Sequence, residues 1–577
     1  MVPVGADDQY EGMTTGAHVV VERLIARGVD VCFANPGTSE MHFVAALDSA
    51  PQMRAVLCPF EGVATGAADG YARIAGRPAA TLLHLGPGMA NGLANLHNAR
   101  RAHSPVVNVV GDHATYHQKL DAPLQSDIDA LGNWLTGTVH RVTSGAELSA
   151  AVDAAIFSAT LSRHIATLIL PADLSWSESE SEGAATESVP LTAREQEIVR
   201  LLSQGYTTRE VAEKLTVSTR TVEGHVYRVL QKRQRTTEES FAGLTPVDVD
   251  TTGAANVLKS HGAHTVLLLG GPATTAAGLR AAARICAATG AKALVETFPA
   301  RLARGQGVPD IPRLGYFAEQ AQEQLRGTTH LMLVEARSPV TFFAYPNMES
   351  DLVPEGANIH TLTIRALEEL ADRLGAPEAP ASLASPAELP TGPLRSDNWA
   401  SVIGALLPEN AIISDEANTS GLLLPYATAA SPPHDVLTLT GGAIGQGLPV
   451  AIGAAIAAPE RPVVALQADG SALYTISALW TMAREQLDIT VVILNNHAYA
   501  ILQLELTRVG ASAAGPKAQS LLDLSNPDID FVAIATGFGV PATRATTAEE
   551  LAAQFSAAIA EPGPHLIDAA VPAPSFG

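Results

Sequence analysis

Residues 461–501 read RPVVALQADGSALYTISALWTMAREQLDITVVILNNHAYAI and contain two apolar runs, each followed directly by polar residues. The first run leads to Asp469 and the second leads to Asn496, which lies 27 positions further on (496 − 469). Apolar runs separated by a helical segment predict parallel strands, whose carboxyl ends meet at one edge of a sheet. The oxygens of Asp and Asn placed there are hard ligands, suited to Mg²⁺ shared with a diphosphate.

This spacing resembles the cofactor motif of thiamine-diphosphate (ThDP) enzymes, in which GDG is followed by a helix, a strand and NN. One departure is Ala468, which stands where the family usually has the first glycine. The resemblance implies three magnesium ligands and two neighbouring cofactor-binding residues: Asp469, Asn496 and the backbone carbonyl of Ala498, with Gly470 and Ser471.

A second motif, VLCPFEGVATGAADGYARIAGRPAATLLHLGPG at residues 56–88, resembles the pyrimidine-binding domain of the acetolactate synthase and benzoylformate decarboxylase branch of these enzymes. The resemblance implies that Glu61 hydrogen-bonds the ring nitrogen of the aminopyrimidine and so favours its imino tautomer. His84 aligns with a proton-handling histidine of benzoylformate decarboxylases. A histidine at a strand end is also a common structural residue, so both roles of His84 stay open.

Two further segments match the same family. In TGGAIGQGLPVAIGAA, residues 440–455, the resemblance implies that the carbonyl of Gly442 accepts from the 4′-amino group and that Ile444 holds the cofactor in a bent shape. In SDEANTSG, residues 414–421, it implies diphosphate contacts by Asn418 and Thr419. Some relatives bind FAD in the middle domain, but no motif here demands it.

A different kind of segment, PLTAREQEIVRLLSQGYTTREVAEKLTVSTRTVEGHVYRVLQKR, occupies residues 190–233. It resembles the LuxR-type helix-turn-helix domain, whose third helix enters the major groove of DNA. Residues 220–235 contain five basic and one acidic side chain, a charge of +4, in a chain whose net charge is −23. The expected DNA contacts are Arg220, Thr221, His225 and Arg228. A spacer or a protein-binding module is the alternative, and in each case we expect the insert to fold by itself and project from the enzyme surface.

The composition, 47% hydrophobic and 16% charged, predicts sizeable cores. Three widely spaced cysteines and no apolar leader fit a cytoplasmic protein without a membrane segment. We expect an α/β protein with three doubly wound α/β domains (pyrimidine-binding, middle and diphosphate-binding) plus an inserted all-α helix-turn-helix module. The expected boundaries are 13–180, 187–243, 250–375 and 393–577, with the insert as the second range.

The resemblance implies decarboxylation of a small 2-oxo acid with ThDP and Mg²⁺, followed by transfer to a carbonyl acceptor, as in acetolactate synthases. Leu502 stands where pyruvate decarboxylases have a protonating glutamate, and an apolar pocket short of acids favours this carboligation. Two alternatives stay open: a benzoylformate-decarboxylase-like enzyme that releases an aldehyde, and a transcription regulator with a ThDP fold as its sensor. The family further implies a homodimer or homotetramer with its sites at the subunit interface.

Overall fold

The computed structural model describes residues 14–136, 138–179, 191–203, 208–218, 221–222, 224–226, 228–229, 251–345, 348–378, 385–509 and 515–573. The chain divides into two compact units, Met1–Val247 and Asp248–Gly577, and each is described by itself.

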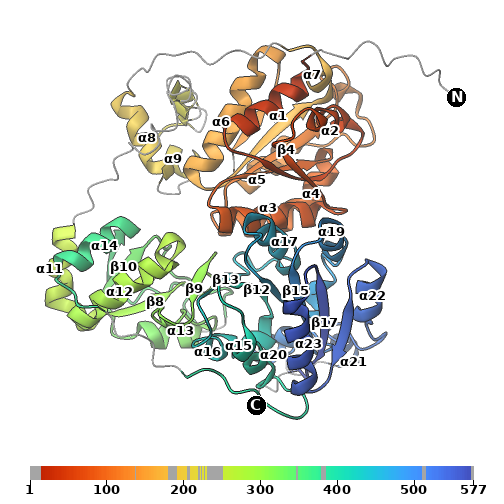
Figure 1. Ribbon diagram of the computed structural model, residues 1–577. Coiled ribbons are helices and arrows are strands. Elements are labelled where there is room, and N and C mark those ends of the chain that lie inside the picture. Colours follow the sequence, from red (N-terminus) through yellow and green to blue (C-terminus); the bar gives the residue numbers. More distant parts are fainter. Residues whose placement is uncertain are drawn as a thin grey trace. The chain divides into compact units, whose positions relative to one another are not determined.

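The first unit is built on a parallel sheet of six strands in the order β2-β1-β3-β4-β6-β5 (Figure 1). The runs rich in Val, Ala and Leu that form its central strands are buried on both faces, as parallel sheets require. The strands are β1 (Val31–Asn35), β2 (Arg54–Leu57), β3 (Ala79–Leu83), β4 (Val106–Asp112), β5 (Val139–Arg141) and β6 (Ile165–Pro171).

Helices cover both faces of this sheet. One face packs against α1 (Gly16–Ala26), α2 (Met41–Asp48), α6 (Leu148–Ser162) and α7 (Ala172–Trp176), and the other against α3 (Glu61–Ala75), α4 (Leu85–Arg101) and α5 (Ile128–Leu135). Short 3₁₀ turns are η1 (Thr38–Glu40), η2 (Gln118–Leu120) and η3 (Gly145–Glu147). Sequence order reverses between β1 and β3, because β2 lies on one side of β1 and β3 on the other.

The inserted module forms α8 (Ala193–Ser203) and α9 (Thr208–Lys214), and residues 221–222, 224–226 and 228–229 are also helical. Its small core of Ile198, Val199, Val211, Val222 and others is completed by α6, which contributes Ala154 and Phe157, with Leu161 packed at the edge. The described part of the insert is therefore docked on the enzyme domain and does not project freely, contrary to our expectation. The apolar side chains of the insert share one buried cluster with α6, so part of their burial comes from the enzyme domain.

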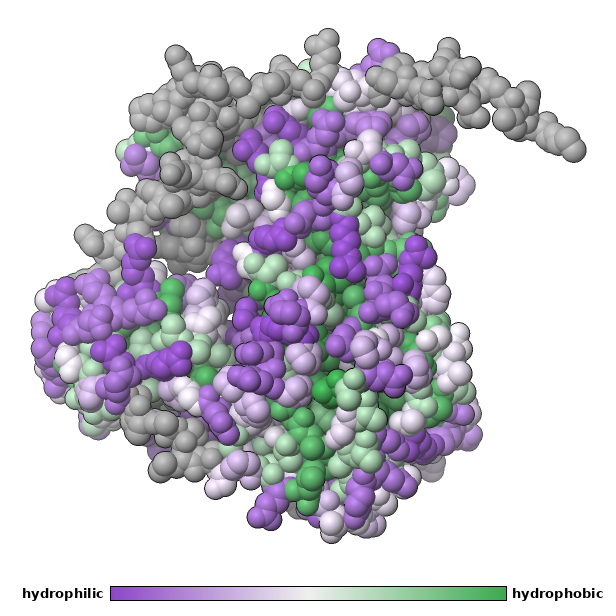
Figure 2. Space-filling model, viewed as in Figure 1, coloured by the Kyte–Doolittle hydropathy of each residue, from purple (hydrophilic) through white to green (hydrophobic). Residues whose placement is uncertain are grey.

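The second unit begins with a parallel sheet of four strands in the order β11-β10-β7-β8. These strands are β7 (Thr265–Leu269), β8 (Lys292–Val295), β10 (His330–Val334) and β11 (Asn358–Leu362). Around them lie α11 (Thr251–His261), α12 (Ala276–Thr289), α13 (Ala318–Leu325) and α14 (Ile364–Arg373), with the turns η5 (Gly262–His264) and η6 (Gly271–Thr274). Figure 2 shows that hydrophilic residues dominate the visible face over α11 and α14.

The remainder of this unit is a sheet of seven strands in the order β16-β17-β15-β14-β12-β13-β9. Its strands are β9 (Leu302–Arg304), β12 (Ile412–Glu416), β13 (His434–Thr438), β14 (Val463–Ala468), β15 (Ile489–Asn495), β16 (Ala542–Ala545) and β17 (His565–Ala570). Its helices are α15 (Trp399–Leu406), η7 (Asn418–Gly421), α16 (Leu424–Ala427), α17 (Gly447–Ala457), α18 (Asp469–Ala472), α19 (Ala478–Glu485), α20 (Ala500–Arg508), α21 (Pro516–Ser520), α22 (Phe531–Gly537) and α23 (Ala548–Ala560).

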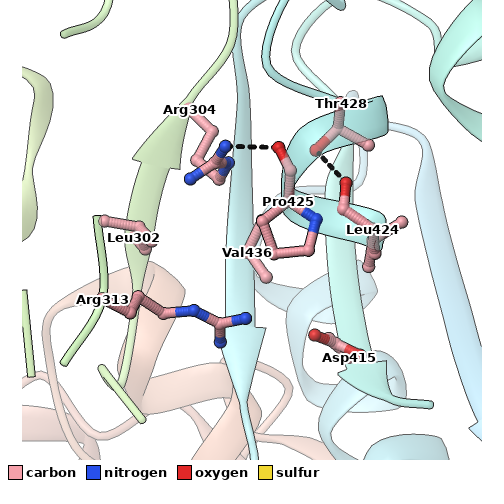
Figure 3. Close-up of a pocket in the computed structure, with 8 residues that line it drawn as sticks. All are labelled: Leu302, Arg304, Arg313, Asp415, Leu424, Pro425, Thr428 and Val436. Atoms are coloured by element: carbon pink, nitrogen blue, oxygen red, sulfur yellow. Dashed lines mark hydrogen bonds between the residues drawn. The ribbon is translucent and has the colours of Figure 1, made fainter. Parts of the chain in front are cut away.

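Strand β9 comes from the segment between β8 and β10 and pairs antiparallel with β13, so it joins the two sheets of this unit. Arg304 of β9 donates to the carbonyl oxygen of Pro425 at 2.6 Å (Figure 3). A small cavity at this junction is also lined by Arg313 and Asp415.

The predicted fold class is confirmed, because the chain contains three α/β domains built on parallel sheets and a helical insert. One detail was wrong, because the segment between β14 and β15 is not a single helix. It forms α18 and α19, separated by a turn at which the amide of Ala478 donates to the carbonyl of Thr475 at 2.8 Å. Among the described residues, we find no helix long and apolar enough to cross a membrane.

Candidate functional site

The expected metal and diphosphate residues lie at the carboxyl edge of the seven-stranded sheet. The order of strands reverses between β12 and β14, since β13 lies beyond β12 and β15 lies beyond β14. In open α/β sheets, ligands bind outside the carboxyl ends of strands at such a switch point. Asn418 follows β12 and Asp469 follows β14, so the two predicted residues flank this point.

Asp469 is the only described side chain in this group that carries a charge, and it is 1% exposed. Its two oxygens accept from the backbone amides of Gly470, at 2.8 Å, and Asn496, at 3.1 Å. Burial raises the pKa of Asp469, while these backbone N–H groups act in the opposite direction. The bond to Asn496 joins the ends of β14 and β15, which the sequence spacing had predicted to meet.

A hydrogen-bonded chain extends from Asp469 to the end of β12. Asn418 donates to the hydroxyl of Ser471 at 2.8 Å, and Asn496 donates to the hydroxyl of Ser420 at 3.3 Å. Ser420 was not predicted, although it stands two residues after Asn418 in the same segment. Thr419 is partly buried in η7, between these two polar residues.

The oxygen atoms at this edge suit a hard cation such as Mg²⁺, whose other ligands would come from a bound phosphate group. The side-chain oxygen of Asn496 accepts from the amide of Ala498 at 3.0 Å, so the chain turns sharply at the third predicted ligand. In the described ranges, no three His, Cys, Asp or Glu side chains are grouped closely enough to hold a metal ion. One carboxylate, one amide oxygen and one carbonyl would fill only part of the octahedral coordination of Mg²⁺. The remaining positions would be open to the oxygens of a phosphate group.

The loop that carries Gly442 and Ile444 follows β13 and ends where α17 begins. Gly442 has φ +75° and Gly445 has φ +94°, conformations that favour glycine. Gly442 is exposed and Ile444 is partly exposed, so both are available to a ligand. The sequence did not reveal that a buried carboxylate, Glu416 at the end of β12, accepts from the backbone amides of Gly445 at 2.7 Å and Gly447 at 2.6 Å.

In the first unit, Glu61 is the first residue of α3 and is 6% exposed. Asn91 of α4 donates to one of its oxygens at 3.0 Å. A Cβ atom on Gly88 would lie 3.1 Å from the other oxygen, so glycine there leaves room beside the carboxylate.

His84, the residue before α4, is paired with a carboxylate that sequence reasoning missed. Its Nδ1 lies 2.8 Å from Oε2 of Glu40, and the backbone amide of Gly37 donates to the same oxygen at 2.8 Å. Burial raises the pKa of Glu40, whereas the interaction with His84 lowers it. Glu40 follows β1 and His84 follows β3, so the pair flanks the switch point of this sheet.

The available signal for Glu40 was the segment NPGTSE directly after the β1 run. A Gly/Pro turn with an acidic residue at the carboxyl end of a buried strand is a typical place for a functional side chain. A Cβ atom on Gly111 of β4 would lie 1.7 Å from Oε1 of Glu40, so a larger residue there would displace this carboxylate.

Leu502, whose apolar character suggested a pocket poor in acids, is 45% exposed on α20. It lines an open apolar groove of about 340 Å³ together with Leu506, Val509 and Leu521. Glu505 also lines the groove, so one carboxylate lies among these side chains.

The predicted DNA contacts are only partly covered by the structure, since Arg220 lies outside the described residues. Thr221 is exposed, and its hydroxyl lies 2.7 Å from that of Ser218. His225 is partly buried. Arg228 is 52% exposed and its Nε lies 3.8 Å from the buried carboxylate of Glu195.

Three parts of the chain match known family models. Residues 14–132 match the thiamine pyrophosphate enzyme N-terminal TPP binding domain, and residues 418–569 match the C-terminal TPP binding domain. Residues 189–235 match the bacterial regulatory proteins of the luxR family. The predicted insert type is therefore confirmed.

Individual relatives cover almost the whole chain. A Mycobacterium tuberculosis protein named "Putative acetolactate synthase large subunit IlvX" is 55% identical over 96% of this chain and 99% of its own length. Benzoylformate decarboxylase of Pseudomonas aeruginosa is 29% identical over 95% and 97%. The structure of Rhodococcus jostii thiamine diphosphate-dependent 4-hydroxybenzoylformate decarboxylase shares the fold with a TM-score of 0.76 at 22% identity, covering 97% of this chain and 99% of that one.

The two TPP binding domains each contain one of the sites described above, and similarity to acetolactate synthase and benzoylformate decarboxylase extends from end to end. The chain therefore belongs to the thiamine-diphosphate-dependent enzymes of the acetolactate synthase and benzoylformate decarboxylase branch, and it carries a LuxR-type helix-turn-helix insert.

Proposed function

We propose that this enzyme uses ThDP and Mg²⁺ to decarboxylate a small 2-oxo acid and then transfers the remaining group to a carbonyl acceptor. The observation that carries the proposal is the hydrogen-bonded group formed by Asp469, Asn496, Asn418 and Ser471 at a sheet switch point. It supplies the oxygen ligands and small polar groups that a magnesium diphosphate needs.

In this proposal, three ligands hold Mg²⁺: the carboxylate of Asp469, the side-chain oxygen of Asn496 and the carbonyl of Ala498. Four neighbouring residues bind the diphosphate: Asn418, Thr419, Gly470 and Ser471. Only Asp469 carries charge, so the affinity for the metal depends on this carboxylate and on the diphosphate together.

On the pyrimidine side, Glu61 would hold a proton at the ring nitrogen, the carbonyl of Gly442 would accept from the 4′-amino group, and the side chain of Ile444 would support the bound cofactor. The bound cofactor supplies the nucleophilic carbon and the electron sink for loss of CO₂. Because Glu61 and Asp469 lie on different compact units, we propose, from the family resemblance, that two copies of the chain form the active unit. Glu61 of one copy then faces Asp469 of the other.

A specific observation favours an alternative outcome, release of an aldehyde. His84 is paired with the buried carboxylate of Glu40, which can orient the imidazole. A proton donor held in this way would favour release of an aldehyde over transfer to an acceptor. The apolar groove at Leu502 favours transfer instead, so product analysis separates the two outcomes.

The experiment measures CO₂ release from a panel of aliphatic and aromatic 2-oxo acids, with and without ThDP and Mg²⁺, and identifies the organic product. Cofactor-dependent CO₂ release together with a hydroxyketone supports carboligation, and an aldehyde alone supports the alternative. The Asp469→Ala variant is expected to lose Mg²⁺-dependent ThDP binding in calorimetry, because no other charged ligand remains. Unchanged ThDP affinity in that variant would show that the metal site lies elsewhere.

For the insert, residues 187–243, we propose contact with DNA through the third helix. The exposed Thr221 and the half-exposed Arg228, together with the local charge of +4, support this. Fluorescence anisotropy of the full protein with duplex DNA should show binding that weakens steeply with salt and with Arg228→Ala. Binding that does not depend on salt, or no binding at low salt, leaves a spacer or protein-contact role.

If DNA binding occurs without 2-oxo acid turnover, the regulator with a ThDP fold as its sensor becomes the better description. Changes in DNA affinity on addition of ThDP would identify such a sensor directly.

A further inference from the structure

Glu416 is a buried carboxyl group to which the proposed metal, diphosphate and pyrimidine sites assign no role. It is the last residue of β12, beside the switch point, and it is 1% exposed. Its partners are the backbone amides of Gly445 and Gly447, at 2.7 and 2.6 Å, and the side-chain amide of Gln467, at 2.9 Å. These three N–H donors, together with the backbone amide of Gln446, converge on one carboxylate.

These contacts fix the downstream end of the loop that carries Gly442 and Ile444. Further bonds hold the same end: Thr475 donates to the carbonyl of Gly445 at 2.9 Å, and Ser414 donates to the carbonyl of Gly447 at 2.8 Å. The side chain of Gln446, which lies between the two glycines, donates to the carbonyl of Thr438 at 2.9 Å, at the other end of the loop. The loop is thus closed at both ends and presents residues 441–444 between them.

The fit around the carboxylate is tight. A Cβ atom on Gly447 would lie 2.3 Å from Oε1 of Gln467 and 2.9 Å from Cβ of Glu416. A Cβ atom on Gly445, at φ +94°, would lie 2.6 Å from Cβ of Tyr474. The two glycines let the backbone approach Glu416 closely enough for short hydrogen bonds, so this side chain is one of the main supports of the loop.

The ionised form of Glu416 is the form that accepts all of these bonds. Burial raises the pKa of Glu416 to about 7, and the N–H donors of Gly447, Gln467 and Gly445 oppose that rise. A carboxamide at this position has only one acceptor oxygen, and its NH₂ group would face a backbone N–H. Glu416→Gln therefore changes the hydrogen bonding while keeping the size of the side chain.

We propose that Glu416 is a positioning residue that sets the loop at residues 440–447 in the shape that presents the Gly442 carbonyl and the Ile444 side chain to the aminopyrimidine of the cofactor. The inference rests on the proposed function of that loop. Glu416 does not touch the reacting atoms, and it acts through the backbone of residues 445–447.

The first test uses the cofactor-free protein, so it does not depend on turnover. Hydrogen exchange of the peptide that covers residues 440–447 is compared between the wild type and Glu416→Gln. Loss of bonds to a charged acceptor should accelerate exchange of the Gly445 and Gly447 amides by about 10- to 100-fold. The matched control is Asp415→Asn, which neutralises the adjacent carboxylate, because that carboxylate accepts from the amide of Ala417 at 3.2 Å and not from the loop. Unchanged exchange in Glu416→Gln would overturn the proposal.

The second test measures ThDP affinity by calorimetry at saturating Mg²⁺. We expect Glu416→Gln to bind ThDP about 10- to 100-fold more weakly, with Asp415→Asn unchanged. Thr475→Val, which removes only the bond to the Gly445 carbonyl, should show a smaller loss in the same direction, and it provides the measurement if Glu416→Gln does not fold. Faster exchange with wild-type ThDP affinity would refute positioning of the cofactor while leaving the proposed function intact. Failure of the wild-type enzyme to bind ThDP would instead refute the proposed function.

Discussion

Truncation of Phe157 tests whether the insert is docked on the enzyme domain or merely tethered to it. Phe157 is 6% exposed, and together with Ala154 it is the part of α6 that enters the buried cluster of the insert. Replacing a buried Phe with Ala costs about 3–5 kcal/mol, because apolar contact is lost and a cavity remains. Since each 1.4 kcal/mol is a factor of ten, the docking equilibrium should weaken by at least about 10²-fold.

Hydrogen exchange measures this change locally. In Phe157→Ala, the amides of α8 should exchange about 10²-fold faster than in the wild type, whereas those of β6 should keep their protection. Phe555→Ala is the control, because Phe555 is fully buried in α23 of the other unit and its loss should leave α8 unchanged. Unchanged protection of α8 in Phe157→Ala would refute docking on α6. Loss of protection throughout the six-stranded sheet would show that Phe157 belongs to the core of the domain.

The docked insert also changes the design of a deletion. Replacing residues 187–243 with a short Gly/Ser bridge uncovers Ala154, Phe157 and Leu161 on α6. We therefore expect the deletion combined with Phe157→Gln to aggregate less than the deletion alone, because a polar side chain replaces the exposed ring. Equal aggregation of the two proteins in light scattering would argue that α6 was never covered.

Three further predictions concern single side chains. Glu61→Gln should bind ThDP but lose nearly all turnover. If the variant keeps more than about a tenth of the wild-type activity, a loss under ~1.4 kcal/mol, the role assigned to Glu61 is wrong. A mixture of Glu61→Gln and Asp469→Ala proteins should regain some activity if two copies share each site. Gly111→Ala should displace Glu40, because the new Cβ would lie 1.7 Å from the carboxylate, and we expect turnover to fall about 10²-fold. Gly145→Ala is the control, because the space around Gly145 is open, and it should match the wild type in the same CO₂ assay. Burial raises the pKa of Glu296 to about 7, above the roughly 4.3 of a glutamate in an unfolded chain, so its contribution to stability is full below pH ~4.3 and is lost as the pH rises to 7. Glu296→Gln should therefore melt at a higher temperature than the wild type at pH 8. The same difference in melting temperature at pH 4, measured by calorimetry, would contradict this.

The switch-point residues that follow apolar strands were predictable from the sequence. Asp469 and Asn496 each follow a mostly apolar strand, and parallel pairing of two such strands brings their ends together without further information. The place of Glu61, between a strand and a helix rich in Gly and Ala, was also readable from the sequence, whereas its expected role comes from the family resemblance.

Glu40 and Glu416 were missed because their importance arises from contacts distant in sequence. Glu40 depends on His84, 44 positions away, and Glu416 depends on the loop at Gly445, 29 positions away. Strand order in a doubly wound sheet decides which of these segments become neighbours, and local patterns do not encode that order. The docking of the insert was missed likewise, because Phe157 reads as an ordinary core residue of α6.

The crossing of β9 into the neighbouring sheet couples the unfolding of the two sheets of the second unit. Because Leu302 and Arg304 pair with Val436 and His434, the strand order of the larger sheet is completed by a segment that lies earlier in the chain. A protein cut between the two sheets would leave β13 as an open edge strand, a template for pairing with other chains. We therefore expect the two sheets to unfold in one cooperative transition, and neither half to survive excision as a monomer.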